Sequence, residues 1–125
     1  MKKLIRTTAA ITLSLGLAAS LAACNRGENA ADGASVTLAV STLNNPFFVD
    51  LRDGAQKEAD AQGIDLSVVD AQNDSATQAN QLATAATNGS AGVIINAVDT
   101  ETAEAGLAPV VKAELPIVAV DRAVG

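Results

Sequence analysis

From residue 36 onward, four short apolar segments alternate with longer segments of helical character, and this alternation constrains the fold more than any other feature. The apolar segments span 36–41, 64–69, 93–95 and 117–120. Strands that alternate with helices form βαβ units, whose strands are parallel. Near-continuous apolar strands need cover on both faces of their sheet. We therefore predict an α/β fold, a Rossmann-like parallel sheet with helices on both faces.

Three helices are predicted between these strands. The first spans 46–62, where Pro46 suits the first turn because its missing N–H costs nothing there, and Gly63 has the position of a C-cap. The second spans 75–88, and the third runs from 99 or 100 to about 114. Gly106 and Pro109 fall inside the third helix, so we expect it to be kinked or shortened.

The start of the chain has the pattern of a secretory signal peptide. Lys2, Lys3 and Arg6 precede a segment rich in Leu and Ala, whose most apolar run, 9–23, is shorter than the roughly 20 residues that span a bilayer. The sequence Leu-Ala-Ala-Cys at 21–24 resembles the bacterial lipobox, which implies that Cys24 becomes the lipidated first residue of the mature protein. We predict a lipoprotein signal peptide over 1–23, a flexible tether over 24–35 and a folded region over 36–125.

Composition excludes or disfavours several classes of function. The chain has no His and one Cys, which argues against His-dependent acid–base catalysis, Ser-His-Asp hydrolysis, Cys/His zinc sites and internal disulfides. A net charge of −6 and only two aromatic residues argue against nucleic-acid binding. Neither GxGxxG nor GxxxxGK[ST] is present. We therefore expect no metal, no organic cofactor, no nucleic-acid partner and no enzymatic activity.

Polar residues follow each predicted strand. In an open parallel sheet, ligands bind beyond the carboxyl ends of the strands, so these residues are expected to share one edge. Carboxylate, guanidinium and carboxamide groups pair with adjacent hydroxyls, and an aromatic ring packs on an apolar C–H face. A sugar has both features. The residues with this chemistry are Asn45, Phe47, Phe48, Asn96, Asp121 and Arg122.

Each of these residues also has a local explanation. Residues 44–46 fit a helix cap and turn, and the two Phe residues fit a core. Asn96 fits a turn at a strand end, and residues 121–122 fit a solvated ion pair. For Asp70 and Asn73 the turn interpretation is favoured. Spacing alone therefore leaves the sugar site as a hypothesis.

Residues 41–60, Ser-Thr-Leu-Asn-Asn-Pro-Phe-Phe-Val-Asp-Leu-Arg-Asp-Gly-Ala-Gln-Lys-Glu-Ala-Asp, are very similar to the start of bacterial ribose-binding proteins. These are solute-binding components of ABC importers, in the type I periplasmic-binding-protein group. The resemblance continues through 68–73, 94–96 and 116–122, and the spacing of 25 residues from Asn96 to Asp121 fits the group. It covers essentially the whole chain after the tether.

The resemblance implies two α/β lobes joined by a hinge, which close on one pyranose sugar. It implies that this chain is the N-terminal portion, an incomplete first lobe without the second, and that the chain alone binds ribose weakly. The implied partners are D-ribose, an ABC permease and a chemoreceptor. The implied location is exported, on the periplasmic or cell-surface side, held on the membrane by the lipid on Cys24. Carried over residue by residue, the sugar contacts fall on Ser41, Asn45, Phe47, Phe48, Asn96, Asp121 and Arg122.

Three other interpretations stay open at this point. A flavodoxin-like enzyme or signalling domain shares the fold, although the signal peptide counts against it. A sugar-responsive repressor shares it too, but would begin with a DNA-binding helix-turn-helix. A truncated, non-functional gene product is the third.

Overall fold

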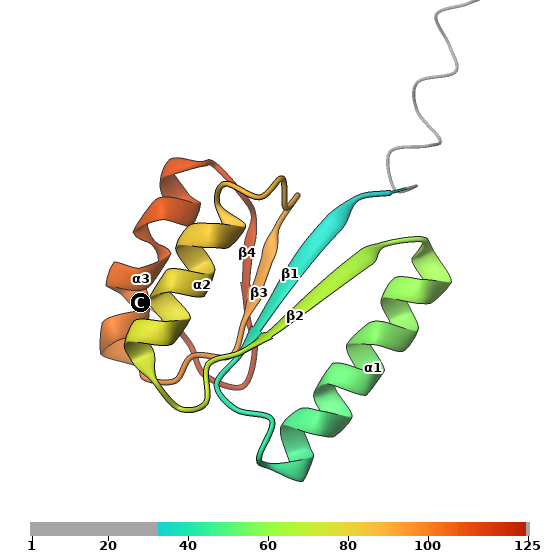
Figure 1. Cartoon of the computed structure of the whole chain (residues 1–125), viewed down its shortest axis with the longest axis horizontal. Helices are drawn as coiled ribbons and strands as arrows, with labels where there is room; N and C mark the ends of the chain where they lie inside the picture. The colour runs from blue at the N-terminus through green and yellow to red at the C-terminus, as the bar shows by residue number, and fades with distance from the viewer. Residues whose placement is uncertain (1–32, 125) are drawn as a thin grey trace, which may run out of the picture.

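The computed structural model describes residues 33–124. The predicted signal peptide, Cys24 and the tether as far as residue 32 lie outside the described residues. Three helices and four strands alternate along the described part of the chain (Figure 1). In chain order these are β1 (Ser35–Val40), α1 (Pro46–Gln62), β2 (Asp65–Asp70), α2 (Ser75–Ala85), β3 (Val93–Ile95), α3 (Thr100–Lys112) and β4 (Ile117–Ala119).

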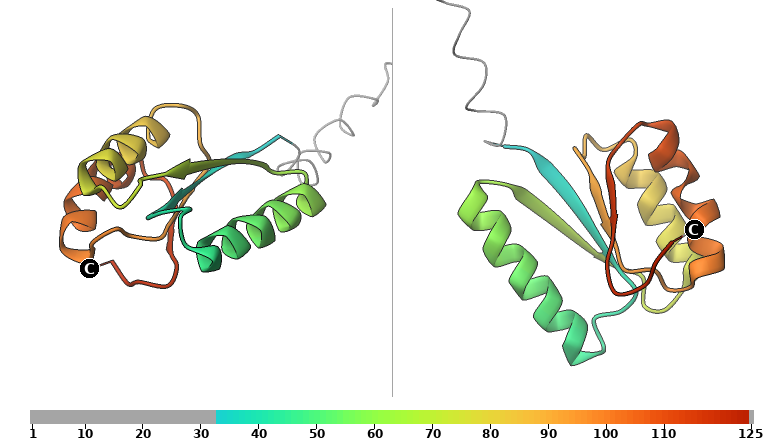
Figure 2. Two further views of the ribbon diagram at one scale, coloured as in Figure 1. Left: turned by 60° about the horizontal axis from the view of Figure 1, so that its bottom comes forward. Right: turned by 180° about the vertical axis from the view of Figure 1, so that it is seen from behind.

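The four strands form one parallel sheet in the order β2-β1-β3-β4. Helix α1 lies on one face of this sheet, and α2 and α3 lie together on the other face (Figure 2). This confirms the predicted α/β fold with helices on both faces. Because all four strands are parallel, their carboxyl ends meet at one edge, where the polar segments were expected.

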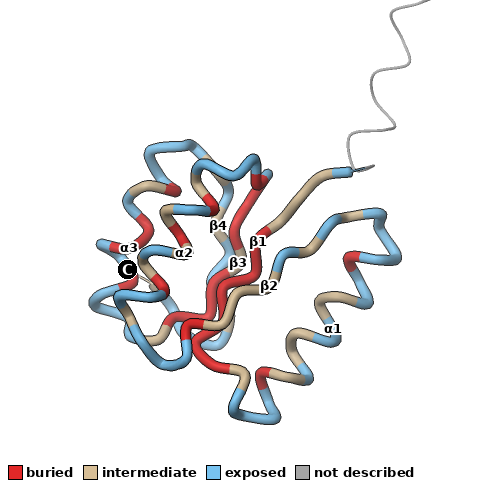
Figure 3. The backbone as a smooth tube through the Cα atoms, viewed as in Figure 1, coloured by how far each residue is buried: buried red, intermediate tan, exposed pale blue. Residues whose placement is uncertain are grey.

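The main core lies between the sheet and the α2–α3 pair. Its buried members come from β1, β3, α2, α3 and the β3–α3 loop, and Figure 3 shows the buried backbone concentrated along the central strands. The two helices pack against each other at Gly106, where a Cβ would lie at ordinary contact distance, 3.4 Å from the Ala79 Cβ and 3.5 Å from the Leu82 Cδ1. The core cluster consists of Ala39, Leu82, Ala85, Val93, Ile95, Ala97, Ala103, Leu107 and Val110.

Helix α3 differs from expectation at Pro109. The helix continues through this residue to Lys112, so the predicted shortening is wrong. Proline removes one i→i−4 hydrogen bond, here to the carbonyl of Ala105, an exposed residue that water reaches. Leu107 and Val110 are buried on the opposite side, and their burial holds the last turn against the sheet.

Helix α2 ends three residues before the predicted boundary at 88. The chain turns after Ala85, and the Asn88 Oδ1 accepts hydrogen bonds from both the N–H and the hydroxyl of Ser90. Gly89 lies in this turn with φ of 89°, a backbone conformation that glycine favours. A side chain that bonds locally in this way competes with continuation of the helix.

Candidate functional site

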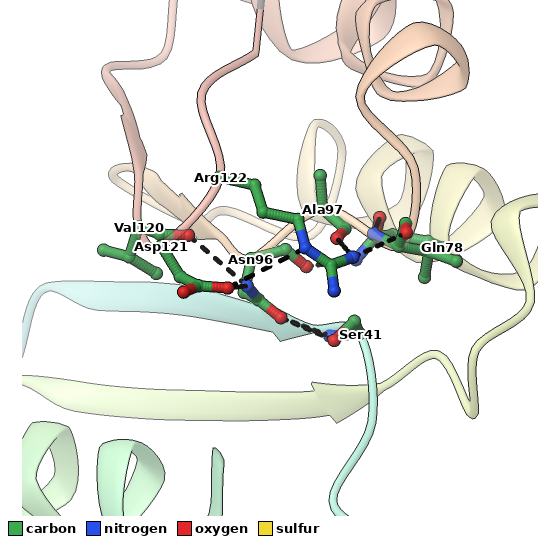
Figure 4. Close-up of polar contacts among 8 residues, drawn as sticks. Ser41, Gln78, Asn96, Ala97, Val120, Asp121 and Arg122 are labelled. Carbon is green, nitrogen blue, oxygen red and sulfur yellow. Dashed lines mark hydrogen bonds and ion pairs between the residues drawn. The ribbon is translucent and has the colours of Figure 1, made fainter. Parts of the chain in front are cut away.

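Three loops and the segment after β4 meet at the carboxyl edge of the sheet. They are the β1–α1 loop at 41–45, the β2–α2 loop at 71–74, the β3–α3 loop at 96–99 and residues 120–124. Figure 4 shows how side chains from the β1–α1 loop, the β3–α3 loop and the segment after β4 connect. The predicted site residues do lie along this edge, but they differ in how far they are exposed.

Ser41 and Asn96 form a buried pair at the centre of the edge. Asn96 is 0% exposed and Ser41 is 1% exposed. The Asn96 Oδ1 accepts from the Ser41 hydroxyl at 2.6 Å and from the Ser41 N–H at 3.2 Å. Two donors on one oxygen fix the orientation of the amide, so the Asn96 Nδ2 points away from Ser41.

The Asn96 Nδ2 holds the residue that follows β4. It donates to the Asp121 Oδ2 at 3.2 Å and, over a longer distance of 3.4 Å, to the Val120 carbonyl (Figure 4). Asp121 has φ of 66°, a left-handed conformation that is uncommon outside glycine. The buried amide therefore stabilises a strained backbone position that carries an exposed carboxylate.

Arg122 is anchored at one end of its guanidinium group. Its Nη1 donates to the carbonyls of Ala97 and Val98, at 2.9 and 2.8 Å. Its Nε lies 3.8 Å from the Asp121 Oδ2, and the two side chains are 45% and 38% exposed. The edge thus presents a carboxylate and a guanidinium side by side, with both open to solvent.

The start of α1 contributes an exposed ring. The Asn45 Oδ1 caps the helix by accepting from the Phe47 N–H at 3.0 Å, as the local interpretation expected. Phe47 is 55% exposed, whereas Phe48 is 6% exposed. The two rings meet edge to face with centroids 5.2 Å apart. Only the Phe47 ring presents a broad surface to solvent.

The β2–α2 loop braces the same edge from the other side. Gln72 and Asn73 both have positive φ, 53° and 58°, and the Asn73 N–H donates to the Ser41 carbonyl at 2.7 Å. The Gln72 N–H donates to the Asp70 Oδ1 at 2.8 Å. Asp70 and Asn73 are thus turn residues, as the sequence favoured. Ser41 is bonded on both sides, to Asn73 and to Asn96.

Gln78 was missed by the sequence analysis. It lies on α2, is 3% exposed, and bridges the two sides of the β3–α3 loop through its carboxamide. One signal in the sequence could have found it. Gln78 precedes Leu82 by four residues and Ala85 by seven, so it shares the buried face of the helix.

Two acidic residues near this edge, Asp74 and Asp99, are helix N-caps. Hydrogen bonds from the backbone N–H and hydroxyl of Thr102 hold the pKa of Asp99 below its ordinary value, and the Arg122 charge adds to this. Thr77 lowers the pKa of Asp74 in the same way. Within residues 33–124, no three acidic, Cys or His side chains gather closely enough to hold a metal ion.

An apolar cavity of about 200 Å³ lies near the opposite edge, between α1 and the sheet. Its lining includes Val36, Ala59 and Leu66, and it shares no residue with the polar edge. On the same face of the sheet, the Val118 side chain on β4 is 54% exposed. No helix among the described residues is long and apolar enough to cross a bilayer.

Comparison with known sequences identifies similar proteins. Residues 36–125 match the family described as periplasmic binding protein domain. The chain is 37% identical over 122 residues to the ribose import binding protein of Haemophilus influenzae, an alignment that covers 98% of this chain and 39% of that protein. It is also 37% identical to the ribose import binding protein of Escherichia coli, of which it covers 38%. The chain therefore spans about two fifths of the length of these curated relatives.

Solved structures agree with the fold. An ABC transporter solute binding protein from Mycobacterium smegmatis with bound glycerol is 35% identical, with a TM-score of 0.70 over 74% of this chain and 32% of that one. The myo-inositol binding protein of Caulobacter, bound to myo-inositol, is 31% identical, with a TM-score of 0.70 over 73% of this chain and 31% of that one.

Proposed function

This chain belongs to the periplasmic binding protein domain family, as its sequence predicted, and we propose that it serves as the solute-binding component of an ABC importer for D-ribose or a related monosaccharide. The observation that carries this proposal is the exposed pair of Asp121 and Arg122. Asn96 donates a hydrogen bond to the Asp121 carboxylate, and two carbonyls of the β3–α3 loop accept from the Arg122 guanidinium. The proposed role is binding and delivery without chemical change.

The chemistry of this pair suits a neutral polyol. A guanidinium can donate hydrogen bonds to two adjacent hydroxyl oxygens, and a carboxylate can accept hydrogen bonds from two adjacent hydroxyl groups, so both groups suit a ligand with neighbouring hydroxyls. Their charges cancel, so an uncharged ligand is favoured over an anion. The exposed Phe47 ring offers an apolar surface for the C–H face of a sugar.

Ribose is the favoured ligand among polyols. The curated relatives at 37% identity are named as ribose import binding proteins. The solved relatives at 35% and 31% identity hold glycerol and myo-inositol, which also carry adjacent hydroxyls. The shared ligand class is therefore a neutral polyhydroxylated molecule.

We assign different roles to the predicted site residues. Asn45, Phe47, Asp121 and Arg122 contact the sugar directly, because their side chains reach the solvent edge. The buried Ser41 and Phe48 support Asn96 and Phe47. Asn96 reaches the sugar only by exchanging its 3.4 Å bond to the Val120 carbonyl for a bond to a ligand hydroxyl.

The location and the remaining partners are part of the same proposal. The protein is exported to the periplasmic or cell-surface side, and a lipid on Cys24 anchors it through the tether of residues 24–35. An ABC permease and a chemoreceptor are its protein partners. Radiolabelled palmitate tests the anchor, since incorporation should disappear in Cys24→Ser and persist in a matched Ser20→Ala variant.

The sequence also predicts that the 125-residue chain alone binds ribose weakly, and we retain this as a proposal. The contacts described above all lie on one open edge, so a ligand there would keep much of its surface in water. Each additional charge-assisted contact is worth about 1.5–3 kcal/mol. Calorimetric titration of D-ribose into the 125-residue chain and into any longer product of the gene tests this proposal. Micromolar binding of D-ribose to the 125-residue chain would refute it.

A thermal-shift panel on the longest product of the gene, called the full-length protein below, tests the function itself. D-ribose, D-allose, L-arabinose, myo-inositol and glycerol are compared at equal concentration. We expect D-ribose to raise the Tm most, because a ligand that binds only the folded state stabilises it by mass action. If no polyol in the panel raises the Tm, the proposed function is wrong.

A further inference from the structure

Gln78 joins two elements that are distant in sequence. Its Nε2 donates to the Asn96 carbonyl at 3.0 Å, and its Oε1 accepts from the Val98 N–H at 2.9 Å. The two bonded groups flank Ala97, where the chain has left β3 and lost its strand partners. One buried carboxamide therefore clamps the β3–α3 loop from both sides (Figure 4).

The loop that Gln78 holds also binds the Arg122 side chain. The two carbonyls that accept from the Arg122 Nη1 belong to Ala97 and Val98, and Val98 is the residue whose N–H the Gln78 side chain holds. A shift of this loop would move both acceptors together. Because a guanidinium is planar and rigid, its other N–H groups would turn with them.

We infer that Gln78 is a positioning residue, which fixes the direction of the Arg122 guanidinium through the β3–α3 loop and thereby sets the affinity for the polyol. The effect on affinity rests on the proposed function. The effect on Arg122 does not, because it follows from the contacts of the protein alone.

A purely structural role is the competing explanation. A buried backbone N–H or carbonyl without a partner is unfavourable, so any buried glutamine that satisfies such groups adds stability. The structural role predicts a loss of Tm and nothing else. The positioning role also predicts a change in Arg122 motion.

Helix α2 supplies a matched control. Gln81 lies three residues further along the same helix, and its Nε2 donates to the Asp70 carbonyl at 2.9 Å. Its buried Oε1 has no hydrogen-bond partner in the structure. Gln81 thus bonds to the last residue of β2 and makes no hydrogen bond to the β3–α3 loop that holds Arg122.

The experiment compares Gln78→Met with Gln81→Met in the full-length protein. Methionine keeps the length of the side chain and removes its hydrogen bonds. The readout is the {1H}–15N NOE of the Arg122 Nε–H, which is assigned by its disappearance in Arg122→Lys. We expect the NOE to fall by about half or more in Gln78→Met and to stay unchanged in Gln81→Met, although both variants lose Tm. An unchanged Arg122 NOE in folded Gln78→Met overturns the inference.

Affinity for D-ribose is measured on the same proteins. We expect the Kd to rise about tenfold in Gln78→Met, the scale of one misplaced charge-assisted hydrogen bond, and to change less than about twofold in Gln81→Met. Equal changes in the two variants would leave only a structural role. If the wild type binds no polyol, the proposed function fails while the NOE still decides the role of Gln78.

A second variant covers the case in which Gln78→Met does not fold. Gln78→Asn keeps the carboxamide but shortens the side chain by one methylene group, so it cannot reach both the Asn96 carbonyl and the Val98 N–H. We expect a smaller fall in the Arg122 NOE than in Gln78→Met, and an NOE equal to the wild-type value would contradict the inference.

Discussion

Asn96→Asp tests whether the buried amide holds Asp121 as described. The substitution keeps the shape of the side chain and the oxygen that accepts from Ser41. It replaces the Nδ2 donor with a second oxygen that faces the Asp121 Oδ2 at 3.2 Å and the Val120 carbonyl at 3.4 Å. An attractive contact at a fully buried position thus becomes a repulsive one.

The size of the effect follows from the distance. Two unit charges 3.2 Å apart repel by about 5 kcal/mol at an effective dielectric constant of 20 and by about 1 kcal/mol in bulk water. The Asp121 side chain is 38% exposed, so water screens part of the repulsion, whereas residue 96 is buried. We expect the free energy of unfolding to fall by about 2–4 kcal/mol at pH 7.5.

The loss should depend on pH. Burial and a neighbouring carboxylate both raise the pKa of the introduced carboxyl in the folded state above its unfolded value of about 4. The penalty is then complete above the folded-state pKa and is removed as the pH falls toward the unfolded value. Urea unfolding followed by circular dichroism should therefore show most of the lost stability restored near pH 4.5.

Asn45→Asp is the matched control for this substitution. Its side chain is exposed at the N-terminus of α1, where a carboxylate accepts the same Phe47 N–H and the helix dipole favours negative charge. We expect no loss of stability there at pH 7.5. The reasoning is refuted if Asn96→Asp is as stable as the wild type at pH 7.5, or if its deficit is the same at both pH values.

Three further outcomes are expected from denaturation experiments. Gly106→Ala should stabilise the fold by about 0.5–1 kcal/mol, because its Cβ would meet Ala79 at an ordinary contact distance of 3.4 Å and alanine has the higher helix propensity. Gly106→Val should lower the stability, because the larger side chain would crowd α2; equal effects of the two substitutions would contradict the described packing of α3 against α2. Leu82→Ala, at a 1% exposed position, should cost about 2–5 kcal/mol, and a loss below about 1 kcal/mol would show that this core is not close-packed. The pKa values of Asp74 and Asp99 are lowered in the folded state, so their contribution to the free energy of unfolding is present above the unfolded value near 4 and is lost as the pH falls through the folded-state values. The double variant Asp74→Asn and Asp99→Asn keeps both helix caps, and its stability should therefore fall less steeply between about pH 5 and pH 2 than that of the wild type. An unchanged pH dependence would show that other groups are responsible for the loss of stability in acid.

The fold was predictable because its signals are local. Pro46 and Gly63 mark the two ends of α1, and the apolar run at 93–95 coincides with β3. The remaining strand boundaries differ by a residue, since ladder pairing and not apolarity sets where a strand ends. The end of α2 was missed because the Asn88 side chain bonds to Ser90, a local contact that helical periodicity does not reveal.

The location of the site could be predicted from the sequence, but the hydrogen bonds among its residues could not. The rule that ligands lie beyond the carboxyl ends of parallel strands brought residues 41–48, 96 and 121–122 to one edge. It could not show that Asn96 is buried beneath Asp121, because that depends on how the chain turns after β4, with Asp121 in a left-handed conformation. Nor could it separate exposed Phe47 from buried Phe48, which are adjacent in sequence and have the same side chain.

We propose that the carboxyl edge of this sheet binds a monosaccharide through Arg122. Calorimetric titration of D-ribose into the full-length protein tests it most directly, with Arg122→Met beside Arg52→Met, which removes the same charge from an exposed pair with Asp53 on α1. We expect the wild type and Arg52→Met to bind D-ribose alike and Arg122→Met to bind it about 10–150-fold more weakly, the equivalent of about 1.5–3 kcal/mol. Binding of D-ribose with the same affinity in Arg122→Met would contradict it.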